Sequence, residues 1–290
     1  MMANEVMVEA KIELLGILEY MVDPTVNNFI SSNLLNPSEL EYKKRVNHYF
    51  SPFLQHSALL GLKDLFSNGF KSEQAVRLLL YHSQIPYLFS QPMIQNQKHL
   101  EWIKQLRLWI DDTKFPLFFE NNLALYQHIT EAVETSISQI PIFDIIELFF
   151  GERKPSYSIF ASSIKTGNFN VFLPNKGLAV VLGSPILSSL TLYPRLIHEL
   201  ALGFIKPAID LYWSLFQKEE NTTKKKVDRD LVYDLIAKAV QEFLIPGSIY
   251  ENSLITSLVE SISTEYQAKR NVYPLFSMFI PQLAKFFKEP

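Results

Sequence analysis

A histidine and a glutamate stand side by side at His198-Glu199, within the segment RLIHELALGFIKP (195–207). A zinc peptidase uses His-Glu-x-x-His at such a place, because two histidines four residues apart share one face of a helix and can both bind one Zn²⁺. The intervening glutamate then acts as general base on the metal-bound water. Here Leu202 stands where the second histidine is needed, and leucine cannot bind a metal.

The His-Glu pair is a weak signal by itself, because a lone histidine on an apolar helix face is more often a packed core residue. Composition narrows the alternatives. The chain has no cysteine, so only histidines and carboxylates could hold zinc. Its nine glycines form no phosphate-binding loop. The net charge of −3, from 27 basic and 30 acidic residues, gives no general attraction to nucleic acid, which is not expected as a partner.

The segment LIHELALGFIKP resembles the HEFSHSFVNP-like segment of a bacterial family of zincin-like metallopeptidases of unknown physiological function. Three further segments are similar to that family and follow its order along the chain: residues 47–88, 146–162 and 250–266. The resemblance implies a zincin-like core in which two histidines and a downstream glutamate hold zinc. Zinc is therefore the only cofactor that we expect, if any binds.

Transferred residue by residue, the resemblance makes His198 the first zinc ligand and Glu199 the catalytic base. Glu251 is the best match for the downstream ligand. Two other glutamates are alternatives for it: Glu242 and Glu260. Leu202 departs from the family's pattern and puts metal binding itself in question. A full ligand set is worth on the order of 10 kcal/mol, whereas one histidine and one glutamate would bind zinc weakly.

Other side chains have a structural interpretation beside a functional one. Tyr193 and Tyr250 could line a cleft, together with Leu202, and stabilise an oxyanion near a metal, although half-buried packing is the more common role of tyrosine. Asp210 lies roughly 120° around the helix from His198, which makes it a poor ligand. Another histidine could supply a third ligand, but each is expected to be structural, and capping or packing is the default for His56. The remaining imidazoles are His48, His82, His99 and His128.

Residues 1 to about 150 are predicted to form consecutive helices, because apolar residues recur there at three- and four-residue spacing. The first 23 residues are expected to be an amphipathic helix rather than a signal peptide, since charged residues interrupt their apolar pattern. Turn-forming residues mark the breaks between helices: Asp23-Pro24, Asn36-Pro37, Ser51-Pro52, Asn68-Gly69, Gln91-Pro92 and Lys114-Phe115-Pro116.

After Gly151, three short segments rich in β-branched and aromatic residues predict a small antiparallel meander at 156–162, 169–174 and 177–183. A long helix is expected from about Leu190 to Gln217, kinked or ended by Pro207. The charge-dense residues 218–230 are expected to form a solvated connection, and the last sixty residues are predicted to be helical.

These elements predict an α+β fold in which helices dominate. An N-terminal helical region (1–150) would precede a zincin-like region (151–290) with the meander, the motif helix and the closing helices, unless both form one compact domain. The apolar stretches are too short to cross a bilayer as helices. Without a secretion signal, a cytoplasmic location is expected, and export by a non-standard route stays open.

Three functions remain in competition. The leading hypothesis is a metallopeptidase-like protein with a degenerate zinc site, inactive or weakly metal-binding. The first alternative is an active zinc-dependent peptidase in which another side chain replaces the missing histidine. The second is a helical module that binds a peptide or protein in the cleft without cleaving it. If no metal binds, Glu199 needs an ion pair or hydrogen bond, because an unpaired buried charge is costly.

Overall fold

A computed structural model describes residues 5–23, 37–80, 96–151, 156–165, 168–173, 177–183 and 192–207, together with scattered positions between 210 and 241. The chain divides into two compact units, residues 1–199 and 200–290. Most of the described residues belong to the first unit. In the second, residues 200–207 are helical, and Asp210 binds the side chains of Arg229 and Tyr233.

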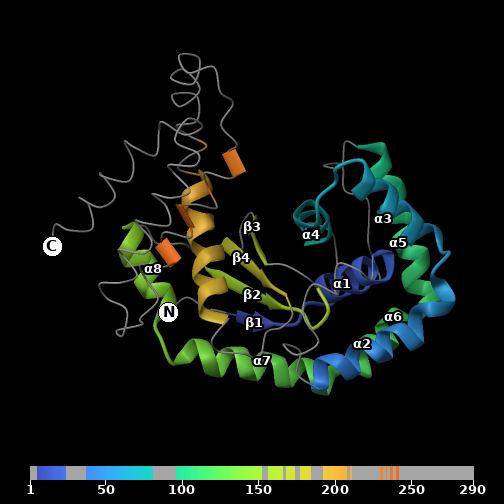
Figure 1. The fold of residues 1–290 in the computed structure, drawn as a ribbon, viewed down its shortest axis with the longest axis horizontal. Helices are drawn as coiled ribbons and strands as arrows, with labels where there is room; N and C mark the ends of the chain where they lie inside the picture. Colours follow the sequence, from blue (N-terminus) through green and yellow to red (C-terminus); the bar gives the residue numbers. More distant parts are fainter. Residues whose placement is uncertain are drawn as a thin grey trace, which may run out of the picture. The chain divides into compact units, whose positions relative to one another are not determined.

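Helices dominate the first unit, and a small sheet accompanies them (Figure 1). The helices before the sheet are α1 (Ala10–Val22), α2 (Pro37–Phe50), the 3-10 turn η3 (Ser51–Phe53), α3 (Ser57–Ser67), α4 (Ser72–Leu80), α5 (Gln97–Thr113), α6 (Phe115–Glu120), α7 (Leu123–Ser138) and α8 (Ile142–Phe150). The predicted breaks that lie in the described part coincide with the ends of these helices. Gln91-Pro92 lies outside the described residues.

The sheet contains β1 (Glu5–Met7), β2 (Tyr157–Ala161), β3 (Phe169–Leu173) and β4 (Gly177–Leu182), in the order β1-β2-β4-β3. The three predicted strands are confirmed, and so is the antiparallel pairing of β3 with β4. The antiparallel meander is wrong, because β2 pairs with β4 in parallel and β1 adds a second parallel pair. The sheet is therefore mixed, and β4 has every residue buried, as is usual for a central parallel strand.

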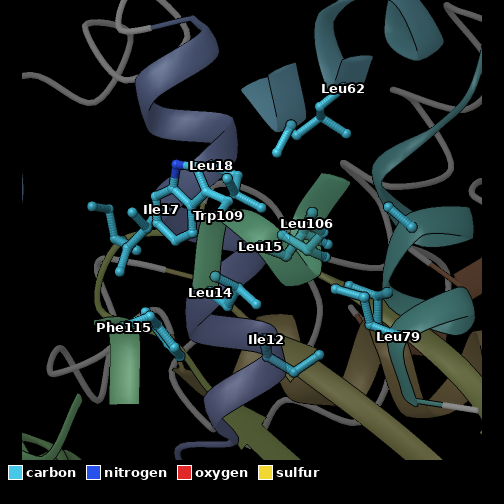
Figure 2. Close-up of a cluster of buried hydrophobic side chains, with 14 of the residues drawn as sticks. Ile12, Leu14, Leu15, Ile17, Leu18, Leu62, Leu79, Leu106, Trp109 and Phe115 are labelled. Atoms are coloured by element: carbon cyan, nitrogen blue, oxygen red, sulfur yellow. The ribbon is translucent and has the colours of Figure 1, made fainter. Parts of the chain in front are cut away.

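The core of the first unit surrounds α1 (Figure 2). Ile12, Leu14, Leu15, Ile17 and Leu18 point to different sides of this helix and are all fully buried. They meet apolar side chains of α3, α4, α5 and α6, which include Leu62, Leu79, Leu106, Trp109 and Phe115. A helix that is apolar around its whole circumference is stable only when it is enclosed on all sides.

The prediction for the chain start is therefore corrected in two respects. Glu5–Met7 is a strand, and the helix that follows is buried instead of amphipathic, with Lys11 8% and Glu13 0% exposed. The boundary that was predicted near residue 150, between two regions of the chain, would separate β1 from β2, although these two strands pair in one sheet.

Two contacts position the rest of the first unit. The helix α7 packs against β1 and β2, and α4 packs against β3 (Figure 1).

After the sheet, residues 192–207 form one helix, here called the motif helix, in agreement with the described part of the predicted long helix. Residues 218–228 and 242–290 lie outside the described residues. In the part of the chain that is described, no helix has the length and apolar character needed to cross a membrane.

Candidate functional site

His198 and Glu199 lie near the middle of the motif helix, between buried apolar residues. Leu196, Ile197 and Leu200 are at most 3% exposed, so most of the helix surface around the pair is covered. The side chain of His198 is 17% exposed, whereas Glu199 as a residue is 5% exposed. The histidine thus has limited contact with solvent, and the glutamate is a buried carboxylate.

Both carboxylate oxygens of Glu199 have partners. The side-chain amide of Asn170 donates from Nδ2 to Oε2 at 3.1 Å. On the other side, His198 Nδ1 lies 3.2 Å from Oε1, which is a hydrogen bond when this nitrogen carries the proton. Asn170 is itself 5% exposed and lies in β3, in register with Val180 of β4. The expectation that Glu199 has a polar partner is confirmed, and the contact joins the motif helix to the sheet.

Two other polar contacts attach the first turns of the motif helix. The Tyr193 hydroxyl donates to the main-chain carbonyl of Ser136 at the end of α7. The Arg195 guanidinium donates from NH1 to the carbonyl of Gly183, just after β4, at 3.1 Å. Burial lowers the pKa of Arg195, and the nearby negative charge of Glu39 opposes this shift. Tyr193, a candidate cleft residue, directs its hydroxyl to α7 in this arrangement.

The described residues do not fit a zinc site. Leu202 offers no donor atom and is 8% exposed. Within the described ranges, no three His, Asp or Glu side chains come close enough together to hold a metal ion. The candidate downstream ligands Glu251, Glu242 and Glu260, and the candidate cleft residue Tyr250, lie outside the described residues. Among the described residues, the contact that His198-Glu199 makes is hydrogen bonding between the motif helix and β3.

His56 has the structural role expected for it. Its Nδ1 accepts the main-chain N–H of Ala58 at 3.1 Å and so caps the start of α3. The proton must then be on Nε2, which lies 3.3 Å from Asp112 Oδ2 at the end of α5. His99 packs its ring on Phe70, and burial lowers its pKa. His56 therefore links α3 to α5, and His99 links α5 to the turn between α3 and α4.

A second group of buried polar side chains was not anticipated. Glu13 of α1 is 0% exposed, and Ser162, just after β2, donates its hydroxyl to Glu13 Oε2 at 2.6 Å. Nearby, the ammonium of Lys165 donates to Glu19 Oε2 and to Ser72 Oγ, each at 2.5 Å. We call these five residues the buried polar cluster. It connects α1, α4 and the segment that follows β2.

Burial shifts the ionisation of both charged ends of this cluster. Desolvation raises the pKa of Glu13 from 4.5 to about 7, although hydrogen bonds from Ser162, Tyr42 and the main chain of Ser163, and the charge of Lys165, oppose the shift. Burial lowers the pKa of Lys165, and its ion pair with Glu19 opposes that change. The sequence does contain a signal for this buried polar cluster, because Lys11, Glu13 and Glu19 interrupt an otherwise apolar segment.

Comparison of the chain with protein-family models, with curated proteins and with solved structures found no match. The resemblance to a zincin-like family accordingly stays a prediction from the sequence.

Proposed function

We propose that this chain is a metallopeptidase-like protein with a degenerate zinc site, in which the His-Glu pair has a structural role instead of a catalytic one. The proposal rests on the motif in the sequence and on the environment of Glu199. It is the leading hypothesis from the sequence, and the contacts of the motif helix favour it over an active peptidase.

The observation that carries the proposal is the pairing of both Glu199 oxygens. A general base must reach the water that it activates and accept a proton from it. The Glu199 carboxylate is instead buried, with Asn170 Nδ2 at 3.1 Å and His198 Nδ1 at 3.2 Å. To act as a base, it would have to exchange these buried hydrogen bonds for a bond to water, which costs free energy.

Leu202 supports the same conclusion from the ligand side. Position 202 is four residues after His198, about 6 Å along the helix, where a second imidazole would face the same ion. The buried leucine contributes packing there and no donor atom. One substitution can therefore test whether the rest of a zinc site survives.

The first experiment compares the zinc content of the purified wild-type protein with that of Leu202→His, both prepared without chelators. We expect little zinc in the wild type and a clear increase in the variant. Lys206→His is the matched control, because it adds an imidazole to the same helix about 12 Å from His198, too far to share the ion. Near-stoichiometric zinc in the wild type would overturn the proposal and favour a replacement ligand. Zinc in neither protein would remove the zincin assignment of this helix.

A peptidase assay separates the proposal from its main alternative. Wild-type protein and Glu199→Gln, both supplemented with zinc, and wild type kept in chelator without added zinc are each incubated with an unfolded protein substrate. The proposal expects the same background cleavage in all three samples. Cleavage that requires both Glu199 and the metal would instead identify an active zinc peptidase.

A further inference from the structure

The buried polar cluster lies where the segment after β2 meets α1. Gly16 shows how closely the two are packed, because a Cβ atom at this position would stand 2.9 Å from Ile164 Cγ2 and 3.0 Å from the main-chain nitrogen of Lys165. Ser162 Oγ accepts the main-chain N–H of Lys165 at 3.0 Å. The same hydroxyl donates its proton to Glu13 Oε2 at 2.6 Å. Ser162 therefore organises the loop 162–165 and attaches it to α1.

We propose that Glu13 makes the attachment of the loop 162–165 to α1 sensitive to pH, so that its neutral carboxyl keeps the loop closed and its ionisation favours opening. This inference is independent of the proposed function, because it involves neither the motif helix nor a metal. It concerns local opening of the loop, without loss of the whole fold.

The charges around Glu13 explain why ionisation is unfavourable. Among the described residues, Lys165 is the cation whose charge acts on Glu13, and its ammonium already forms an ion pair with Glu19 of α1 at 2.5 Å. Tyr42 of α2 and Tyr126 of α7 bond to each other at 2.7 Å, and the pKa of each is raised, mainly by burial. These hydroxyls are neutral and can only donate hydrogen bonds to the carboxylate. If Glu13 ionised, its carboxylate would share the ammonium of Lys165 with the carboxylate of Glu19.

The helix α2 also buries Lys43 and Glu39, and the charge of Glu39 acts on Lys43, which is not among the groups that shift the pKa of Glu13. The helices α3 and α4 supply no charge among their described buried residues. From α3 the buried residues are Ala58, Leu59, Leu62 and Leu65. From α4 they are Ala75, Val76 and Leu79, and its Ser72 hydroxyl contacts Lys165. The carboxylate therefore gains solvation chiefly when the loop 162–165 opens and water reaches the cluster.

The direction of the pH effect follows from the raised pKa. In the closed state Glu13 has a pKa of about 7, against 4.5 for the solvated group. The closed state then holds the proton more tightly than the open state. The contribution of Glu13 to the stability of the closed state is therefore fully present below about pH 4.5 and is lost as the pH rises to about 7. Between pH 6 and pH 8 the opening equilibrium should increase about tenfold.

Hydrogen–deuterium exchange of the main-chain amides in the loop 162–165 measures this opening, after correction for the pH dependence of the chemical exchange rate. We expect opening of the wild-type loop to increase about tenfold from pH 6 to pH 8, and to stay constant in Glu13→Gln. Glu9→Gln is the control, since Glu9 is the N-cap of the same helix. It should retain the tenfold change. An equal change in Glu13→Gln and the wild type, or no change in the wild type, would overturn the proposal.

A second variant tests the proposal even if Glu13→Gln folds poorly. Ser162→Ala removes the 2.6 Å hydrogen bond that attaches the loop to Glu13 of α1. The loop should then be more open and Glu13 better solvated, so its titration, followed by the chemical shift of its ¹³C-labelled carboxyl group, should move from about 7 toward 4.5. A titration midpoint near 4.5 in the wild type would contradict the proposal, and so would an unchanged midpoint in the variant.

Discussion

Glu13 and Glu199 are both buried carboxylates, and their partners differ in kind. Glu199 receives an amide hydrogen from Asn170 and contacts the ring of His198, which can carry a positive charge. Glu13 receives a hydroxyl hydrogen from Ser162, while the ammonium of Lys165, whose charge acts on Glu13, is held by Glu19. Burial thus raises the pKa of Glu13 to about 7. The carboxylate of Glu199 connects the motif helix to β3, whereas that of Glu13 makes the attachment of the loop 162–165 dependent on pH.

The strength of the Glu199–Asn170 contact can be measured with a double-mutant cycle. Glu199→Ala, Asn170→Ala and the double variant are compared with the wild type by urea unfolding. We expect a coupling free energy of about 1.5–3 kcal/mol, the range of hydrogen bonds to charged groups. Each single variant leaves a buried polar group without its partner, so each should be clearly less stable than the wild type.

Glu73 and Arg77 provide the reference pair for this cycle. Arg77 NH2 lies 3.1 Å from Glu73 Oε1 on α4, at i,i+4 spacing. The side chains of Glu73 and Arg77 are 31% and 53% exposed. Such a pair should show a coupling of only about 0.3–0.5 kcal/mol. If Glu199 and Asn170 coupled no more strongly than this, the carboxylate would not be held by β3, and the structural role proposed for it would fail.

At the level of single residues, local chemistry was predictable and long-range partners were not. Capping or packing was the role expected for His56, and its Nδ1 caps α3. A polar partner for Glu199 followed from the cost of a buried charge. The identity of that partner, Asn170 in β3, depends on how a strand and a helix pack together. Glu13 was missed for the same reason, because Ser162 is 149 residues further along the chain.

At the scale of elements, the sequence predicts where strands form better than how they pair. Short β-branched segments located β2, β3 and β4, and the tight connection between β3 and β4 indicated their antiparallel pairing. The alternation of side chains specifies faces of a strand and does not specify its neighbour. The three residues of β1 adjoin an apolar helix whose pattern they continue, which is why they were assigned to it.

The close packing of α1 against the loop 162–165 predicts an unusual effect of Gly16→Ala. Alanine in place of glycine normally stabilises a helix by about 1 kcal/mol. Here the new methyl group would meet the main-chain nitrogen of Lys165 at 3.0 Å, and such overpacking costs about 1–3 kcal/mol. We expect Gly16→Ala to lower the free energy of unfolding, measured by urea denaturation.

Gly61→Ala in α3 is the matched control for this substitution. Its Cβ would meet Oε1 of Gln105 at 2.7 Å, and that atom is the end of a flexible side chain that can move away. This variant should be as stable as the wild type or gain up to about 1 kcal/mol. Stabilisation by both substitutions would mean that the loop does not rest on α1, and would remove the geometric basis of the pH-sensitive contact.

At the scale of the first unit, the chain start is the element that connects the helices to the sheet. Glu5–Met7 pairs with residues 158–160, and α1 follows two residues later and fills the centre of the helical core. Sequence patterns identified the helices and their breaks, because these depend on neighbouring residues. They could not identify a sheet that joins the first strand to residues 153 positions away, since that pairing arises only when the whole unit is folded.

This connection predicts that damage to β1 affects the distant tryptophans. Val6→Pro places proline in the middle of the strand, where its φ near −65° differs from the −120° of parallel strands and where it has no N–H to donate. We expect a loss of about 2 kcal/mol, with Val6→Thr, which keeps the N–H and favours strands, as the control. Trp102 and Trp109, both buried in α5, report on the helical core when the third tryptophan, Trp213, is replaced by phenylalanine in every sample. Urea unfolding followed by tryptophan fluorescence and by circular dichroism should shift to lower urea together, as one cooperative transition requires. A fluorescence transition that stays in place would instead mean that the helical core unfolds independently of the sheet.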